Sequence, residues 1–132
     1  MSELRETYSG IAQKLQDIFE CTDFSERHMR LNVPVKGDMY PVMIYRGVSR
    51  LKNEREVVHV ASPLLNVPVS AALSVAQDMD IMPIGGIRLL GELLHVHEAY
   101  GVNEVSVAQL EQCVRFIAAQ AADMNVSFAG GE

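Results

Sequence analysis

The chain has 132 residues, of which 48% are hydrophobic and 21% charged, and its formal net charge is −6. This size and composition are typical of a single globular domain that buries its own core. No apolar run approaches the roughly 20 residues that a membrane-spanning helix needs. The start "MSELRETYSG" lacks the apolar stretch of a signal peptide. We therefore expect a cytoplasmic protein with no membrane contact.

The composition also disfavours nucleic-acid binding and disulfide frameworks. With 17 acidic and 11 basic residues, the chain lacks the basic stripe that neutralises phosphates, and only Arg46–Arg55 is locally basic. The two cysteines, Cys21 and Cys113, lie far apart and both fall in helical patterns. A free cysteine in such a position behaves as a small apolar side chain, so neither a redox nor a zinc role is indicated.

The first half of the chain predicts a helix followed by strands. Apolar spacings of three and four indicate a helix over Ser2–Cys21; they come from Leu4, Tyr8, Ile11, Leu15, Ile18 and Phe19. Strict alternation over His28–Val35 predicts a half-buried strand, and Pro34 on its outer phase favours an edge position. After the turn Lys36–Asp38, the segment Met39–Ser49 is apolar on both phases, which is typical of a central strand.

The second half predicts a third strand, a helix, a hairpin and a last helix. Val57–Leu65 reads as the strand, and Pro68 suits the first position of a helix that continues to Met82. Two apolar runs flank Gly91–Glu92, a pair suited to a type II′ hairpin turn. The predicted register opposes Leu90 to Leu93, Leu89 to Leu94, Arg88 to His95 and Ile87 to Val96. Ser106 and Gln109 form a capping box before the last helix.

These elements predict an α+β fold. Their order is α-β-β-β-α-β-β-α, with a five-stranded antiparallel sheet packed against three helices. Residues 1–132 form one domain, and residues 126–132 are expected to be a frayed tail. In the predicted hairpin, Ile87, Leu89, Leu94 and Val96 share the core face.

The most distinctive polar stretch is "LLGELLHVHEAYG", in which His95 and His97 project to one side of a strand. A metal site needs a third ligand, for which His59 and Glu98 are the candidates. Glu98 alternates to the opposite face, and Arg88, the expected neighbour of His95, would repel a cation. His59 reaches the same side only if the third and fifth strands are adjacent. We therefore expect an ordinary strand face, and no metal or other cofactor.

No catalytic motif is recognised. The chain lacks Gly-x-Ser-x-Gly, and Cys113 is expected inside a helix, where nothing lowers its pKa. Gly85-Gly86 precedes a strand rather than a helix, so it lacks the context of a phosphate-binding loop. Asp78 and Asp80 diverge at a spacing of two on a helix. A non-enzymatic role is favoured.

Apolar residues in excess of one core indicate a partner surface. The chain has seven methionines, and methionine lines adaptable binding surfaces as well as cores. One layer of three helices does not easily cover both faces of a sheet whose second strand is apolar on both sides. The candidate partner or dimer surface comprises Val69, Leu73, Val75, Met79, Met43 and Tyr45.

The element order resembles the fold shared by class I type III secretion chaperones and YbjN-like proteins. The resemblance spans Leu4 to Met124 and is carried by "VVHVASPLLNVP", "MPIGGIRLLGELLHVHEAYG" and "VSVAQLEQCVRFIAAQAADM". It implies a cytoplasmic homodimer without catalysis that binds a protein partner or client. In the chaperones the middle helix contributes to dimerisation, which here would be Val69–Met82.

Together these observations favour a chaperone-like or regulatory protein-binding module that holds a client segment on an exposed apolar surface. The alternative is an enzyme, or a protein that binds a metal or small ligand, using the strand face of Arg88, His95 and His97.

Overall fold

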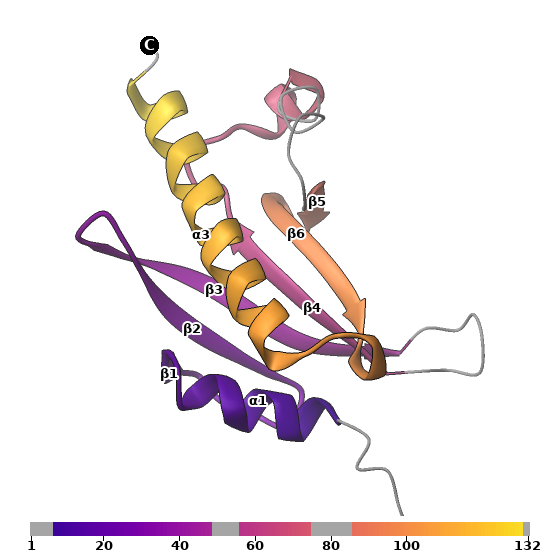
Figure 1. Ribbon diagram of the computed structural model, residues 1–132. Helices are drawn as coiled ribbons and strands as arrows, with labels where there is room; N and C mark the ends of the chain where they lie inside the picture. The colour runs from indigo at the N-terminus through magenta and orange to yellow at the C-terminus, as the bar shows by residue number, and fades with distance from the viewer. Residues whose placement is uncertain (1–6, 49–55, 75–85, 131–132) are drawn as a thin grey trace, which may run out of the picture.

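The computed structural model describes residues 7–48, 56–74 and 86–130. Figure 1 shows a sheet crossed by one long helix, with a shorter helix beside it. The elements in chain order are α1 (Tyr8–Gln16), β1 (Glu20–Thr22), β2 (His28–Val35), β3 (Asp38–Val48), β4 (Glu56–Pro63), the 3₁₀ turn η1 (Val69–Ala71), β5 (Gly86–Leu90), β6 (Leu93–Gly101), the 3₁₀ turn η2 (Val102–Glu104) and α3 (Val107–Gly130). The predicted α+β class with an antiparallel sheet is confirmed.

The sheet has six strands in the order β1-β2-β3-β4-β6-β5. The meander β2-β3-β4 was predicted, and every neighbouring pair is antiparallel. The sequence pattern predicted β5 as one neighbour of β6 and left the other open, and the structure places β6 between β4 and β5. This adjacency decides which side chains of the two halves of the chain meet.

The sixth strand, β1, was missed because its residues continue the helical apolar spacing. The helix α1 ends at Gln16, and Phe19 is buried after the helix has ended. Cys21 therefore lies in a strand, not in a helix as predicted. Since β1 covers β2 at Arg30–Asn32, β2 is not the edge strand we expected, although Pro34 lies beyond the end of β1.

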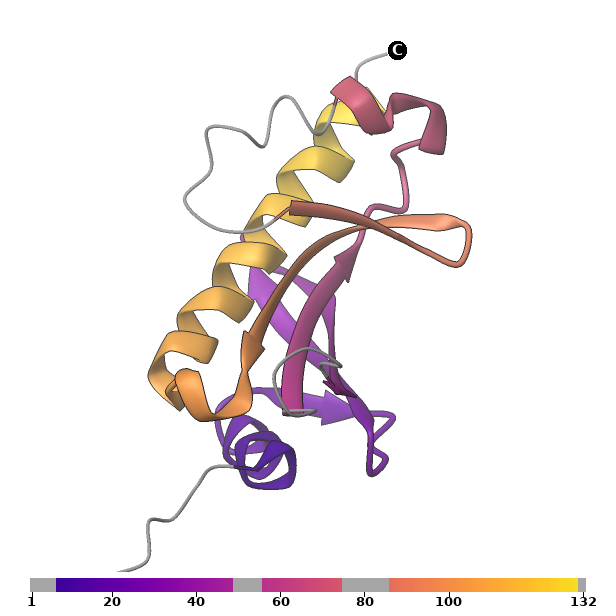
Figure 2. The same cartoon turned by 90° about the vertical axis from the view of Figure 1, so that its right-hand side faces the viewer.

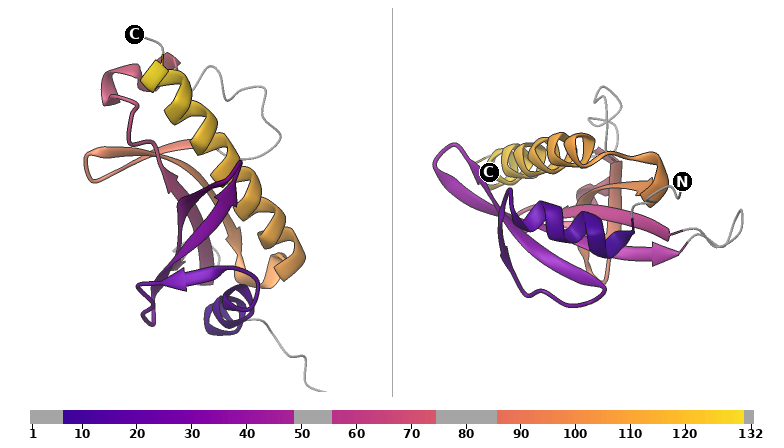
Figure 3. Two further views of the ribbon diagram at one scale, coloured as in Figure 1. Left: turned by 90° about the vertical axis from the view of Figure 1, so that its left-hand side faces the viewer. Right: turned by 60° about the horizontal axis from the view of Figure 1, so that its bottom comes forward.

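The helices α1 and α3 lie on the same face of the sheet, which we call the helix face (Figures 2 and 3). Alternate strand residues point into the core between these layers, and burying each such side chain stabilises the fold by about 1.5–3 kcal/mol. They include the fully buried Met29, Leu31, Val33, Val42, Ile44, Val58, Val60 and Val96. Leu89 was also expected in the core, but it is 52% exposed. It lies on the edge strand β5, away from the central strands that α3 crosses.

The two hairpin turns follow from their glycines. Lys36 and Gly37 both have positive φ, at 52° and 90°, as a two-residue type I′ turn requires. Gly91 has φ 64° while Glu92 does not have positive φ, consistent with the predicted type II′ turn. The predicted register of β5 and β6 is confirmed at all four residue pairs.

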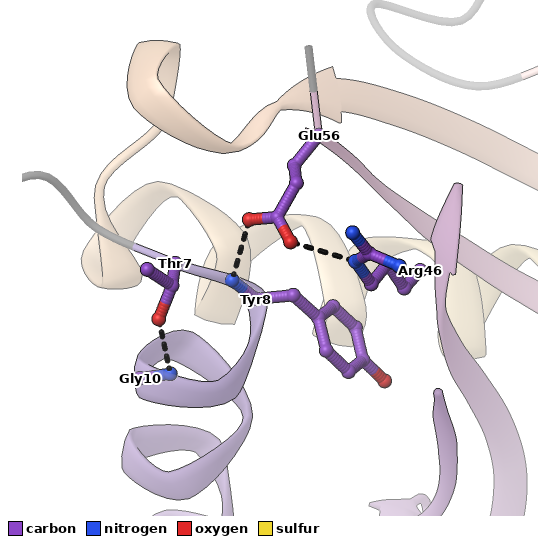
Figure 4. Close-up of polar contacts among 5 residues, drawn as sticks. All are labelled: Thr7, Tyr8, Gly10, Arg46 and Glu56. Atoms are coloured by element: carbon purple, nitrogen blue, oxygen red, sulfur yellow. Dashed lines mark hydrogen bonds and ion pairs between the residues drawn. The ribbon is translucent and has the colours of Figure 1, made fainter. Parts of the chain in front are cut away.

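The helix α1 is fixed to the sheet through its first turn (Figure 4). The Thr7 side chain caps it by accepting a bond from the Gly10 amide at 3.1 Å. The Glu56 carboxylate accepts the Tyr8 amide at 3.3 Å and pairs with Arg46 at 2.6 Å. The Tyr8 hydroxyl donates to the buried carbonyl of Ile44 at 3.1 Å. A carboxylate at a helix N-terminus is also favoured by the helix dipole.

The helix α3 begins at the predicted capping box and extends further than expected. Ser106 Oγ accepts the Gln109 amide at 3.0 Å, and Gln109 Oε1 accepts the Ser106 amide at 2.8 Å. Residues 126–130, predicted as part of a frayed tail, continue the helix to Gly130. Buried Asn125 lies in this last part of α3 and binds the segment that follows β4.

The predicted middle helix is described only at its start. Pro68 precedes the 3₁₀ turn η1 instead of occupying the first helical position, and residues 72–74 are helical. Its continuation to Met82 lies outside the described residues, as do Val75, Met79, Asp78, Asp80 and Gly85.

Candidate functional site

The face of the sheet opposite the two helices is the candidate site, and we call it the helix-free face. Strand register places on it the alternate residues that do not point into the core. Its central residues are Arg30 on β2, Met43 and Tyr45 on β3, His59 and Ala61 on β4, His95 and His97 on β6 and Arg88 on β5. Neither α1 nor α3 lies on this side in Figures 2 and 3.

Four of these residues form a contact group, which we call the histidine cluster: Tyr45, His59, His97 and Arg88. The ring of His59 stacks on that of Tyr45, with centroids 4.5 Å apart and 5° between the planes. His59 Nδ1 lies 2.9 Å from His97 Nε2, a hydrogen bond between the two imidazoles. The Arg88 guanidinium lies 3.5 Å from the same His97 nitrogen. Four different strands thus contribute to one group.

Burial keeps the two bonded imidazoles neutral. It lowers the pKa of His59 to about 4, with smaller contributions from His97 and Arg88. Burial also lowers the pKa of His97, and the Arg88 charge lowers it further. Both rings are therefore uncharged at pH 7, so one must donate and the other accept in their shared bond.

The position of Arg88 determines which imidazole donates. A guanidinium has donors only, so it is compatible with an unprotonated His97 Nε2 and would repel a proton on it. The His59 Nδ1–H therefore donates to His97 Nε2. The Tyr45 hydroxyl is buried and has no hydrogen-bond partner among the described residues. The Arg88 charge also acts on Tyr45, opposing the rise in its pKa that burial causes.

Gly47 makes room for the imidazole of His59. A Cβ built on Gly47 would lie 2.5 Å from His59 Nε2, closer than any van der Waals contact permits. Gly47 thus allows the ring to lie flat over the strand and stack on Tyr45.

The sequence left open whether His59 lies on the same face as His95 and His97, and the structure answers this question. His59 does share a face with His97, because β4 and β6 are neighbours. His95 stays outside the pair, with its Nδ1 3.1 Å from the carbonyl of Leu93. Glu98 lies on the opposite face from His97, as its alternation predicts. Arg88 opposes His95 in the register, also as predicted.

The cluster offers little to a metal ion. The facing nitrogens of His59 and His97 bind each other, and Arg88 beside them disfavours a cation. Within residues 7–48, 56–74 and 86–130, no group of three histidine, cysteine or acidic side chains that could hold a metal ion is found. Burial raises the pKa of Cys113 to about 11, so that thiol is a poor nucleophile.

The residues of the predicted partner surface fall in two places. Met43 and Tyr45 are half-buried on the helix-free face. Val69 and Leu73 are exposed in η1 and in the helical residues that follow it, and Leu73 is 74% exposed. The exposed Leu65 lies close to them in the chain. We call Leu65, Val69 and Leu73 the end patch.

A separate groove lies between the β2–β3 turn and the last turns of α3. It is lined by Val35, Lys36, Asp38, Tyr40, Ala122, Asp123 and Val126. Its polar contact is an exposed ion pair between Lys36 and Asp123 at 3.5 Å, which contributes little stability. The groove contains no cluster of chemical groups comparable to that on the helix-free face.

The sequence pattern did not reveal the Tyr45 hydroxyl or the role of Gly47. The available signal was the phase of alternation, because Tyr45, Gly47 and His59 all occupy the outward phase of their strands. That signal becomes specific only when the partners of each strand are known.

No protein-family model matches the chain, and no curated protein matches it at a significant level. None of the described helices is both long and apolar enough to cross a membrane.

Proposed function

We propose that this chain is a non-enzymatic protein-binding module, chaperone-like or regulatory, that acts in the cytoplasm. It holds an extended segment of a partner protein on the helix-free face of its sheet. The observation that carries the proposal is that Met43, Tyr45 and Leu93 lie on this face, which neither α1 nor α3 covers, and are partly exposed among the described residues. Apolar surface of this kind, rimmed by polar side chains, marks binding sites.

The shape and chemistry of the face suit an extended segment. Side chains of such a segment alternate, so every second one can reach the sheet while the others point to solvent. The flexible thioether of Met43 and the exposed Met39 can adapt to different side chains. The resemblance to class I secretion chaperones points to the same kind of partner.

We also propose that the chain forms a homodimer through the end patch and the predicted middle helix Val69–Met82, of which residues 75–82 lie outside the described residues. Large apolar side chains as exposed as Leu65 and Leu73 favour association.

The test is affinity capture from native cell extract, comparing the wild type with Met43→Glu and Phe24→Glu. Phe24 is 58% exposed and lies in the loop between β1 and β2, outside the sheet, so it controls for an added charge on an apolar site. We expect one dominant partner at a fixed ratio with the wild type and the Phe24 variant, and at least tenfold less with Met43→Glu. Circular dichroism should show that both variants are folded. Equal recovery with all three proteins, or recovery of no partner, would refute the proposal.

A further inference from the structure

The two faces of the sheet differ in charge. The acidic strand residues Asp38, Glu56 and Glu98 occupy the phase of the helix face. The strand arginines on the helix-free face are Arg30 and Arg88. Among the strand residues described, the acidic exception on this face is Glu20, on the edge strand β1. Arg46, the third arginine of the described strands, lies on the helix face and pairs with Glu56. A chain with net charge −6 thus presents two of its three described strand arginines on the helix-free face.

The two arginines of this face are available to a ligand. Both are exposed, and neither forms an ion pair with a carboxylate of the described residues. Arg88 contacts the neutral imidazole of His97, which accepts a hydrogen bond but supplies no negative charge. The nearby Tyr45 hydroxyl is a buried donor without an acceptor among the described residues, and leaving such a group unbonded is destabilising. These donors match an anion, and a guanidinium matches the planar geometry of a carboxylate.

We propose that the helix-free face binds an acidic segment of a protein partner, with one carboxylate on Arg88 and a second on Arg30. This proposal rests on the proposed function and specifies the partner that the face accepts. As a carboxylate engages Arg88, the guanidinium moves away from His97, and the Tyr45 hydroxyl gains an acceptor.

The geometry sets the spacing of the two acidic residues. Arg88 on β5 and Arg30 on β2 are separated by the strands β6, β4 and β3. Four strand spacings span about 19 Å, which an extended chain covers in about six residues. Two acidic side chains six positions apart point to the same side of an extended segment. Between the arginines lies the partly exposed Met43, which suits an apolar side chain at an intervening inward position.

A protein segment fits this face better than a nucleic acid does. Nucleic acids carry closely spaced phosphates, which the net charge of −6 repels at long range. The partly exposed side chain of Met43 between the arginines has no apolar counterpart in a phosphate backbone.

The test uses two labelled peptides and fluorescence anisotropy with the full chain. The first peptide has glutamate at two positions six residues apart, with leucine at the inward positions between them and serine elsewhere. The second has glutamine in place of both glutamates. We expect the glutamate peptide to bind at least tenfold more tightly, and its affinity to fall as salt is raised from about 50 mM to about 300 mM.

The variants Arg88→Gln and Arg30→Gln should each weaken binding of the glutamate peptide by about 10- to 100-fold, as expected for a hydrogen bond to a charged group. Lys36→Gln removes the same charge from the exposed β2–β3 turn and should change the affinity less than twofold. The imidazole NMR signals of His97 and His59 should shift when the glutamate peptide is added to the wild type.

Three results would overturn this inference and leave the proposed function intact. They are equal affinity for the two peptides, equal losses with Arg88→Gln and Lys36→Gln, and absence of binding to either peptide while the native partner is still captured. A capture experiment that recovers no partner, or recovers it equally with all three proteins, would instead refute the proposed function and this inference with it.

Discussion

At the scale of single residues, His59 holds the most constrained position on the helix-free face. Its ring is stacked on Tyr45, bonded to His97 and approached by the backbone of Gly47. Each contact depends on a neutral, flat imidazole in one orientation. The residue therefore links the pH response of the protein to the packing of its central strands.

We expect the stability of the protein to fall as pH decreases from about 6.5 to 4. Folded His59 has a pKa of about 4, whereas the ordinary pKa of a histidine is 6.5. In this window the unfolded chain binds a proton that the folded chain does not, so stability is full above pH 6.5 and is lost as pH falls. The urea midpoint should be lower at pH 5 than at pH 7, and His59→Phe should reduce that difference. His28→Gln, at an exposed histidine of the same face, serves as the control; a pH difference that is unchanged in His59→Phe contradicts the prediction.

Gly47→Ala should destabilise the protein by about 1–3 kcal/mol, the usual cost of overpacking. Its methyl group would force His59 away from Tyr45 and His97, since a Cβ at this position would lie 2.5 Å from the imidazole. Gly86→Ala is the matched control, because a Cβ there has no atom within 4 Å. It should change stability by less than about 0.5 kcal/mol. Chemical denaturation measures both variants, and equal midpoints would show that His59 moves without cost.

At the scale of elements, Asn125 joins the last part of α3 to the segment that follows β4. Its Oδ1 accepts the Asn66 amide at 3.0 Å, and its Nδ2 donates to the Pro63 carbonyl at 3.2 Å. The end patch begins at Leu65 in this segment. The geometry of that patch therefore depends on a buried polar residue of the helix.

Asn125→Ala should lower the free energy of unfolding by about 1–3 kcal/mol, because it leaves the Asn66 amide and the Pro63 carbonyl without partners. Asn103→Ala, at an exposed asparagine of η2, should have an effect below about 0.5 kcal/mol. Thermal unfolding followed by circular dichroism compares the two variants. Similar losses in both would mean that the bonds of Asn125 contribute nothing beyond those of a surface asparagine.

At the scale of the whole molecule, the two candidate surfaces lie in different places. The helix-free face covers the central strands, and the end patch lies near the C-terminal end of α3 (Figure 2). Partner binding and dimerisation can therefore be disrupted separately. This separation makes the two proposals independent.

Leu73→Asp should shift the mass measured by light scattering from that of two chains to that of one. Leu73 is 74% exposed, so the substitution places a charge in the proposed interface without disturbing the core. Met43→Glu, on the helix-free face, should keep the mass of the wild type. A folded Leu73 variant that retains the wild-type mass would show that the dimer interface lies elsewhere, or that the protein is a monomer.

Local sequence patterns were sufficient for the elements whose signals lie within a few residues. Alternation predicted β2 over His28–Val35, and the turn at Gly91–Glu92 predicted the β5–β6 register. Ser106 with Gln109 predicted the start of α3. The strand β1 was not predictable in this way. Phe19 and Cys21 continue a helical spacing, and only pairing with β2 makes the segment a strand.

The sequence by itself determined the α+β class, the hairpins, the capped helix and the outward phase of His59, His97 and Arg88, because these depend on period and turn chemistry within short segments. Only the tertiary structure decided that β6 lies beside β4, that both long helices cover one face, and that the two histidines bond to each other. The physical reason is that strand adjacency depends on how the helices cover the core, which is a property of the whole chain and not of any short segment. The histidine cluster, built from four strands, exists only as a result of that arrangement.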